Sequence, residues 1–401
     1  MPSQTASGRP IERADAGAPA SYADLRRRFQ PLFDAAAEGE PQREREAVPP
    51  REHLRALVEA GFAGLRVPAE HGGEDVPLAT VVRLLADLAE ADPNLAHVWR
   101  NHVSFIEDRR HDRGDPRSAE WLRRLGDGQI AGGGWSEPAE LGAAPLRTVI
   151  EATDQGWRLT GTKYYSTGSV YADWSTVLAL DPGGEQVVAL VGTSAPGVTV
   201  GDDWDGFGQR LTGSGSVRYE AAPVDPEHVF AYAVRYPYQR QYYQSVMHAV
   251  LVGIGRAILR DGVAALRGRK RNHRNGTDEQ AVRDPQLLQV IGEVSALVYA
   301  AESAFLRSLE GLHAVAEAET IDAGELRSSW IAVSLAQQVV ADSVLRAATI
   351  VFDALGASGT SATVALDRHW RNARTLVSHN PRVFQARIVG DWHVNGVDPT
   401  A

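Results

Sequence analysis

The spacing of apolar residues changes twice along the chain, and the order of these changes limits the folds that it can adopt. Apolar residues recur at helical spacing from residue 22 to about 125, give way to short alternating segments between 126 and 229, and return to a longer helical period from 236 to about 355. Because strands and helices are not interleaved, a doubly wound parallel sheet is not expected. The order predicts an α+β protein with separate helical, β and helical parts.

These changes divide the 401 residues into four parts. Residues 1–20 are rich in Ser, Gly, Ala and Pro without a period, and we interpret them as a mobile tail. Residues 21–128 are expected to form an N-terminal helical domain, and residues 129–229 an antiparallel β domain with hairpins. Residues 230–401 are expected to form a bundle of long amphipathic helices, whose wide apolar faces suit contacts with other subunits.

Composition excludes several kinds of site. The chain has no cysteine, so disulfides, thiolate zinc sites, iron–sulfur clusters and cysteine nucleophiles are impossible, and the histidines show no metal spacing. Its 51 Asp and Glu residues exceed its 41 Lys and Arg residues, and the net charge of −10 argues against nucleic acid as a partner. No run of about 18 apolar residues and no apolar leader are present, so we expect a cytoplasmic protein without a membrane span.

Four motifs occur in a fixed order. Residues 132–138 read Gly-Gly-Gly-Trp-Ser-Glu-Pro, and residues 157–168 read Trp-Arg-Leu-Thr-Gly-Thr-Lys-Tyr-Tyr-Ser-Thr-Gly. Residues 209–217 read Gln-Arg-Leu-Thr-Gly-Ser-Gly-Ser-Val, and residues 367–374 read Asp-Arg-His-Trp-Arg-Asn-Ala-Arg. Together they resemble the acyl-CoA dehydrogenase superfamily over about residues 22–395. The resemblance implies the acyl-CoA dehydrogenase fold, with an N-terminal helical domain, a central antiparallel β-barrel domain and a C-terminal four-helix bundle, assembled as a homotetramer.

The positions at which the family carries its catalytic base are not carboxylates here. Acyl-CoA dehydrogenases use a Glu to remove a weakly acidic proton from a thioester, and this base must lie within hydrogen-bond reach of the proton. One family position lies in the loop before the last helix, where residues 374–381 contain neither Asp nor Glu. The other position falls near Arg256. An acyl-CoA desaturase is therefore not expected.

The C-terminal sequence is similar to one subgroup of the superfamily. His379-Asn-Pro, followed by Gly-Asp-Trp-His-Val-Asn-Gly at residues 390–396, resembles the two-component flavin-dependent monooxygenases, which include dibenzothiophene monooxygenases and nitrososynthases. The resemblance implies that a separate flavin reductase supplies reduced FMN or FAD and that oxygen forms a C4a-hydroperoxide on the flavin. One oxygen atom would then pass to a small organic substrate, at an aromatic carbon, a heteroaromatic sulfur or an amine.

Two other functions stay open on the sequence alone. A flavin-dependent acyl-CoA dehydrogenase or oxidase with a relocated base would keep tightly bound FAD and need no reductase. A catalytically silent homologue would serve as a binding subunit and would have no affinity for flavin. The intact glycine-rich motif at residues 132–134 argues against this last function.

Oxygen transfer of this kind needs a dry pocket, a few hydrogen-bond donors and a proton, so hydroxyl and imidazole side chains are the catalytic candidates. We expect His102, Ser166, Thr167 and His379 to fill these roles. The resemblance places His102 on a helix beside the active cavity, and His379 in the loop where other members carry their base. Each histidine could instead be a structural residue whose ring is hydrogen-bonded within the fold.

Cofactor contacts are expected from the first two motifs and from one distant arginine. The resemblance implies that Trp135 and Ser136 lie against the flavin, together with Thr167 and with Tyr165, which replaces the tryptophan of the family. Arg269 aligns with an arginine that reaches the flavin phosphate of a neighbouring subunit, and a guanidinium can bind a phosphate through two hydrogen bonds. A solvated basic helix end is the alternative interpretation of Arg269. No metal site is expected.

Overall fold

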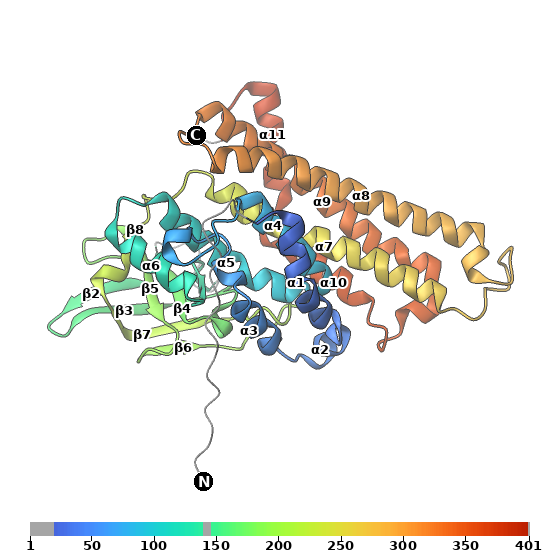
Figure 1. Ribbon diagram of the computed structural model, residues 1–401, viewed down its shortest axis with the longest axis horizontal. Helices are drawn as coiled ribbons and strands as arrows, with labels where there is room; N and C mark the ends of the chain where they lie inside the picture. Colours follow the sequence, from blue (N-terminus) through green and yellow to red (C-terminus); the bar gives the residue numbers. More distant parts are fainter. Residues whose placement is uncertain (1–19, 139–145, 400–401) are drawn as a thin grey trace, which may run out of the picture.

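The computed structural model describes residues 20–138 and 146–399. Helices, then strands, then helices follow one another along the chain in the predicted order. Figure 1 shows the sheet on one side, the first helices in the middle and the long C-terminal helices on the other side. Of the tail expected at residues 1–20, residues 1–19 lie outside the described part of the chain.

The N-terminal group packs around α5, which is buried over most of its length. Asp92 separates α5 from α4, and its carboxylate accepts hydrogen bonds from the backbone N–H groups of Asn94 (3.0 Å) and Leu95 (3.1 Å). Pro93 takes the first position of α5, where a helix needs no N–H donor. The helices of this group are α1 (Tyr22–Ala37), α2 (Glu40–Glu46), α3 (Arg51–Glu59), α4 (Leu78–Ala91), α5 (Pro93–His111) and α6 (Pro116–Gly126).

The middle group is a mixed sheet in the order β6-β7-β3-β2-β4-β5-β8, with β1 paired to β4. The predicted hairpins β2–β3 and β4–β5 are antiparallel, as expected. However, β1 and β2 both run parallel to β4, so the expectation of a purely antiparallel domain is wrong at these two pairings. The strands are β1 (Ala131–Gly134), β2 (Val149–Thr153), β3 (Gly156–Lys163), β4 (Trp174–Leu180), β5 (Gln186–Gly192), β6 (Val198–Val200), β7 (Val217–Val224) and β8 (Val229–Ala231).

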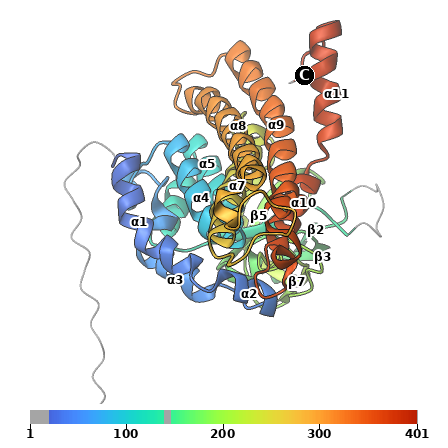
Figure 2. The same ribbon diagram turned by 90° about the vertical axis from the view of Figure 1, so that its right-hand side faces the viewer.

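The C-terminal group consists of three long helices and two shorter ones. Helix α7 packs against α4, α5, α8 and α9, and α10 packs against α7 and α9. Figure 2 shows α11 standing away from the body of the molecule. The helices are α7 (Gln239–Arg267), α8 (Pro285–Ala316), α9 (Ala323–Leu355), α10 (Asp367–His379) and α11 (Arg382–Asn395).

Helix α8 presents apolar side chains to the outside. Leu288 and Tyr299 are 49% and 75% exposed. Of the described helices, α8 alone is long and apolar enough to cross a membrane by length and composition, a test that core helices of soluble proteins also pass. An outward apolar face of this kind also suits contact with another copy of the chain.

The first and last helical groups share one hydrophobic core, and the sheet has a core of its own. A buried ion pair connects the elements where the groups meet. Glu107 of α5 accepts hydrogen bonds from Arg66 at 3.0 and 3.1 Å and from the Tyr238 hydroxyl at 2.6 Å. Burial alone would raise the pKa of Glu107, but the adjacent Arg66 guanidinium holds it below its usual value.

Replacing Glu107 by alanine is expected to lower the free energy of unfolding by about 3–5 kcal/mol, because it leaves the Arg66 cation buried without its main partner. Urea unfolding at pH 7 measures this loss. The exposed substitution Glu70→Ala serves as the control and should change the free energy by less than about 0.5 kcal/mol. A loss below about 1 kcal/mol for Glu107→Ala would contradict a stabilising role for this pair.

Candidate active site

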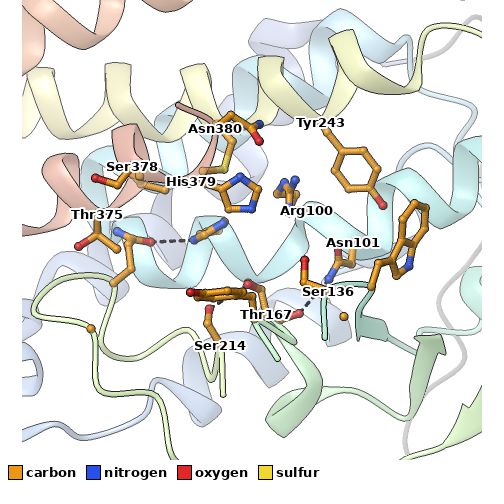
Figure 3. Close-up of a pocket in the computed structure, with 18 of the residues that line it drawn as sticks. Arg100, Asn101, Ser136, Thr167, Ser214, Tyr243, Thr375, Ser378, His379 and Asn380 are labelled. Atoms are coloured by element: carbon orange, nitrogen blue, oxygen red, sulfur yellow. Dashed lines mark hydrogen bonds between the residues drawn. The ribbon is translucent and has the colours of Figure 1, made fainter. Parts of the chain in front are cut away.

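A cavity of about 630 Å³ lies where α5, β1, α7 and α10 come together. Figure 3 shows its side chains converging from the helices above and from the sheet segments below. A volume of this size suits a small-molecule ligand. Its polar lining residues include His97, Arg100, Asn101, Ser136, Thr167, Ser214, Tyr243, Ser378, His379 and Asn380.

The glycines of β1 bring this strand very close to its neighbours. A side-chain carbon added to Gly134 would lie 2.3 Å from the hydroxyl oxygen of Ser166, and one added to Gly133 would lie 2.3 Å from Thr176. Neither distance is possible for a real atom, so the motif is required by protein packing. The tight packing leaves Gly133 and Gly134 as part of the cavity wall.

Two residues hold the segment after β1 against β3. Glu137 accepts hydrogen bonds from the Thr148 hydroxyl (2.7 Å), the Thr148 backbone (2.9 Å) and Lys163 (3.1 Å). The Lys163 side chain is fully buried, and burial lowers its pKa. Lys163 also lies 3.4 Å from the carbonyl oxygen of Trp135. The lysine therefore positions the Trp135 segment and does not itself line the cavity.

The expected cofactor residues Trp135, Ser136, Tyr165 and Thr167 all line the cavity. Tyr165 has a φ of 59°, which turns the chain sharply beside the cavity, and its ring is 52% exposed. Thr167 is buried, and its hydroxyl lies 2.8 Å from that of Ser214. The structure thus brings together four residues that the sequence motifs placed in one site.

Ser166 does not line the cavity. Its side chain is buried behind the wall, next to Gly134. The two residues lie in a tight turn after Tyr165, in which the Thr167 N–H donates to the Tyr165 carbonyl oxygen at 2.9 Å, and this turn directs their side chains differently. Thr167 is the one that lines the cavity.

His102 also lies away from the cavity, contrary to the expected catalytic role. Its ring is fully buried, with Nε2 at 2.9 Å from the carbonyl oxygen of Ala63 and Nδ1 accepting from the backbone N–H of Ala131 at 3.3 Å. Both ring nitrogens are therefore occupied by the backbone. His102 therefore joins α5 to β1 and is a structural histidine.

The histidine of α5 that does line the cavity is His97, which the sequence analysis did not select. Its Nδ1 lies 3.0 Å from the side-chain oxygen of Gln209, and its buried Nε2 has no partner among the described residues. Burial, together with the charge of Arg100, lowers the pKa of His97 to about 3. The ring is therefore neutral at pH 7.

A periodic signal in the sequence could have identified this face of α5. His97, Arg100 and Asn101 are spaced i, i+3 and i+4, which places them on one side of a helix. His102 follows His97 by five residues and points elsewhere. Asn101 donates to the carbonyl oxygens of Gly133 at 2.6 Å and Thr167 at 3.1 Å, so it fastens β1 to the Thr167 segment.

His379 lines the cavity at the end of α10, as expected. Figure 3 shows it beside Arg100, on the helical side of the cavity. The pKa of His379 is held well below its usual range, mainly by desolvation and next by the positive charge of Arg100. Two neutral imidazoles, those of His97 and His379, therefore line the cavity. The single N–H of His97 lies on Nδ1 and donates to the Gln209 side-chain oxygen, so its Nε2 is a hydrogen-bond acceptor.

Arg269 lies outside this cavity. It follows the far end of α7 and donates to the carbonyl oxygen of Ala354 at 2.9 Å. Tyr243, near the start of α7, is about 36 Å from the end of that helix at about 1.5 Å per residue. Arg269 therefore cannot reach the cavity of its own chain, and its expected contact with a neighbouring subunit's flavin remains a prediction.

No carboxylate faces the cavity within the described residues. Arg256, at one family position for the base, is held by Asp87 at 2.8 Å and by Glu302. The other family position is the end of α10, where His379 lies. The polar lining consists of hydroxyls, amides, two neutral imidazoles and two arginines, which suits a flavin ring and contains no carboxylate base for a thioester.

Three family models match successive parts of the chain. The acyl-CoA dehydrogenase N-terminal domain matches residues 24–129, the middle domain residues 134–222 and the C-terminal domain residues 245–382. The chain belongs to the acyl-CoA dehydrogenase superfamily. Its fold of an N-terminal helical domain, a middle sheet domain and a C-terminal helical domain is that of the superfamily.

Individual members of the superfamily resemble this chain over most of its length. Dibenzothiophene monooxygenase of Rhodococcus erythropolis is 28% identical over 383 residues, covering 87% of each chain. The probable FMNH2-dependent monooxygenase SfnC of Pseudomonas putida is 23% identical and covers 87% of this chain and 89% of its own. The crystal structure of TdsC from Paenibacillus sp. A11-2 with FMN and indole is 25% identical, with a TM-score of 0.86 over 94% of this chain and 98% of its own.

The two cavity histidines are expected to stay neutral from pH 8 down to pH 5. Because the folded pKa of His97 is about 3, its ring should bind no proton in this range, whereas free imidazole titrates near pH 6.5. Nitrogen-15 spectra of histidine-labelled protein test this, and the variants His97→Gln and His379→Gln assign the signals. A midpoint between pH 6 and 7 for His97 would contradict the burial and charge environment described above.

Proposed function

We propose that this protein is the oxygenase component of a two-component, flavin-dependent monooxygenase, an oxidoreductase. A separate flavin reductase supplies reduced FMN by diffusion, oxygen is the co-substrate, and the substrate is a small organic molecule. The observation that carries the proposal is the set of hydrogen-bonding side chains in the cavity, which includes His97, Thr167 and His379 and contains no carboxylate base. The similarity to SfnC and to the FMN complex of TdsC supports FMN over FAD.

The flavin ring is proposed to lie on the sheet side of the cavity. Trp135, Ser136 and Tyr165 offer ring faces and a hydroxyl there, and the Thr167–Ser214 hydroxyl pair can donate a hydrogen bond to a ring atom. When bound, reduced FMN supplies the two electrons that activate oxygen, so that one oxygen atom enters the substrate and the other leaves as water. Asn101 keeps Thr167 in place through the backbone.

The histidines are proposed to control the proton at the reacting oxygen. His97 lines the cavity, its Nδ1–H donates to Gln209, and its buried, unpartnered Nε2 is left as an acceptor for a proton-bearing oxygen. Gln209 is itself held in a left-handed conformation, with a φ of 54°, by the Asn372 side chain that accepts from its backbone N–H. His379 reaches the cavity from the end of α10. Neutral imidazoles hold a proton in place without releasing it to solvent.

We propose that the domains and the oligomer are arranged as in other members of the superfamily. We infer that residues 21–128, 129–229 and 230–401 act as the three domains, that the sheet curves into a barrel, and that α7, α8, α9 and α10 form a four-helix bundle. The outward apolar face of α8 would then contact other copies in a homotetramer. Such an assembly would bring Arg269 to the flavin phosphate of a neighbour, and we propose a cytoplasmic location for it.

Loss of one hydrogen-bonding side chain from the cavity should speed the release of hydrogen peroxide. When the protein with reduced FMN is mixed with oxygen, we expect peroxide to appear more slowly than from free reduced FMN. Thr167→Val and His97→Ala should each accelerate its appearance about tenfold, because each removes a hydrogen bond worth about 1–2 kcal/mol. His273→Ala, in an exposed loop, is the control. Release at the free-flavin rate from the wild type, with reduction of bound flavin by an acyl thioester, would support a dehydrogenase instead.

Substitution of Arg269 tests the shared site. Arg269→Ala is expected to weaken FMN binding about tenfold, by removing a charge-assisted contact to phosphate, while the oligomeric state is unchanged. Isothermal titration calorimetry measures the affinity, and sedimentation velocity measures the assembly. Arg271→Ala, two residues further along the same basic segment, is the matched control. Equal FMN affinity in the wild type and Arg269→Ala would show that Arg269 is only a solvated basic residue.

A further inference from the structure

Arg100 is a cation that faces the cavity without an anionic partner. It projects from α5 beside His97 and Asn101, and Figure 3 shows it between His379 and Tyr243. Its guanidinium carbon lies 4.4 Å from the centre of the Tyr243 ring, and its Nε is inaccessible and unpartnered among the described residues. No ion pair of Arg100 occurs within residues 20–138 and 146–399.

The four arginines that are buried in the described part of the chain all have carboxylate partners. Removing a guanidinium from water is costly unless an anion compensates it, and arginine does not lose its proton in proteins. An unpaired arginine at a cavity wall therefore indicates an anion that is supplied from outside the chain. The pairs are Arg66 with Glu107, Arg109 with Asp112, Arg110 with Asp75, and Arg368 with Glu40 and Asp261.

The rest of the cavity reinforces this positive charge. Arg240 lies at the exposed start of α7 and also lines the cavity, and the described lining contains no Asp or Glu. The two lining histidines are neutral, so they add no opposing charge. Although the whole chain has a net charge of −10, this cavity is cationic. Its remaining walls are rich in aromatic rings, including Trp135, Tyr165, Trp204, Phe207 and Tyr243.

We propose that Arg100 binds the carboxylate of an aromatic substrate, so that the enzyme oxidises aromatic carboxylic acids in preference to neutral aromatic compounds. This inference rests on the proposed function and names its substrate class. A planar guanidinium pairs with a carboxylate through two parallel hydrogen bonds, and Tyr243 supports it from the other side. Arg100 thereby acts as a substrate-binding and specificity-determining residue.

The position of Arg100 favours the substrate over the flavin as the source of the anion. The residues expected to contact flavin, among them Ser136 and Thr167, come from the sheet domain and lie on the lower side of Figure 3. Arg100 lies on the upper, helical side with His379 and Tyr243. A carboxylate held there would place the aromatic body of the substrate between the helices and the flavin.

A pair of ligands that differ only in charge tests the proposal. The affinities of 2-naphthoate and 2-naphthamide are measured by calorimetry on the full-length protein saturated with FMN. We expect the wild type to bind 2-naphthoate at least about tenfold more tightly than 2-naphthamide, because only the carboxylate forms a desolvated, charge-assisted pair with Arg100. Arg100→Gln should bring the ratio close to one, Arg100→Lys should keep part of it, and the exposed control Arg55→Gln should keep all of it.

Several outcomes would overturn the proposal. A wild-type affinity ratio near one would overturn the proposal. This measurement needs no variant, so it decides the question even if Arg100→Gln fails to fold. A loss of affinity for reduced FMN in Arg100→Gln and Arg100→Lys, with the ligand ratio unchanged, would assign the arginine to the flavin. The peroxide-release assay on the same wild-type preparation separates the two levels. Slow peroxide release without a preference for the carboxylate would contradict only the substrate class. Fast peroxide release with a carboxylate preference that depends on Arg100 would contradict only the monooxygenase function.

Discussion

Helix α5 crosses the protein where the sheet, the N-terminal helices and α7 meet, and its orientation fixes one wall of the cavity. The Asp92 cap sets where the helix begins, and the buried Arg66–Glu107 pair fixes its later turns. His102 and Asn101 then attach α5 to β1 and to the Thr167 segment through backbone hydrogen bonds. Since α5 is enclosed on nearly all sides, a shift of this helix would move His97 and Arg100 together, relative to the segments proposed to hold the flavin.

Charge distribution gives the cavity its chemical character. Carboxylates are common in this acidic chain, but those near α5 are committed to arginines, as in Glu107 with Arg66 and Asp108 with Arg235. The cavity itself is left with two arginines, neutral histidines and hydroxyls. A site of this composition holds anions and aromatic rings and lacks a group that would remove a proton from carbon. The same feature separates it from the acyl-CoA dehydrogenases whose fold it shares.

Much of the fold could be predicted from the sequence because it rests on local patterns. Apolar periodicity located the helices, and turn sequences located the hairpins β2–β3 and β4–β5. The parallel pairing of β1 with β4 could not be predicted, since the two strands are far apart in the sequence and β1 consists of small residues. The motifs also indicated Trp135, Ser136, Tyr165, Thr167 and His379 as cavity residues.

The errors at the site have one physical cause. The apolar residues of α5 surround it too evenly to reveal a single buried side, so only the polar spacing of His97, Arg100 and Asn101 marks the cavity face, and His102 lies off that face. Ser166 and Thr167 presented a similar problem, because they lie in a tight turn after Tyr165 whose side-chain directions the sequence does not show. Arg100 was missed because the absence of a partner is a property of the folded protein. Only its surroundings show that its charge is uncompensated.

A crystal structure of the protein with reduced FMN, prepared without oxygen, tests the central claim most directly. The account predicts the flavin ring in this cavity, on its sheet side, within hydrogen-bond distance of the Thr167 hydroxyl and with His97 and His379 facing it. His102 should remain bonded to the backbone of Ala63 and Ala131. A flavin bound elsewhere, or a ring that touches neither Thr167 nor His97, would contradict the account.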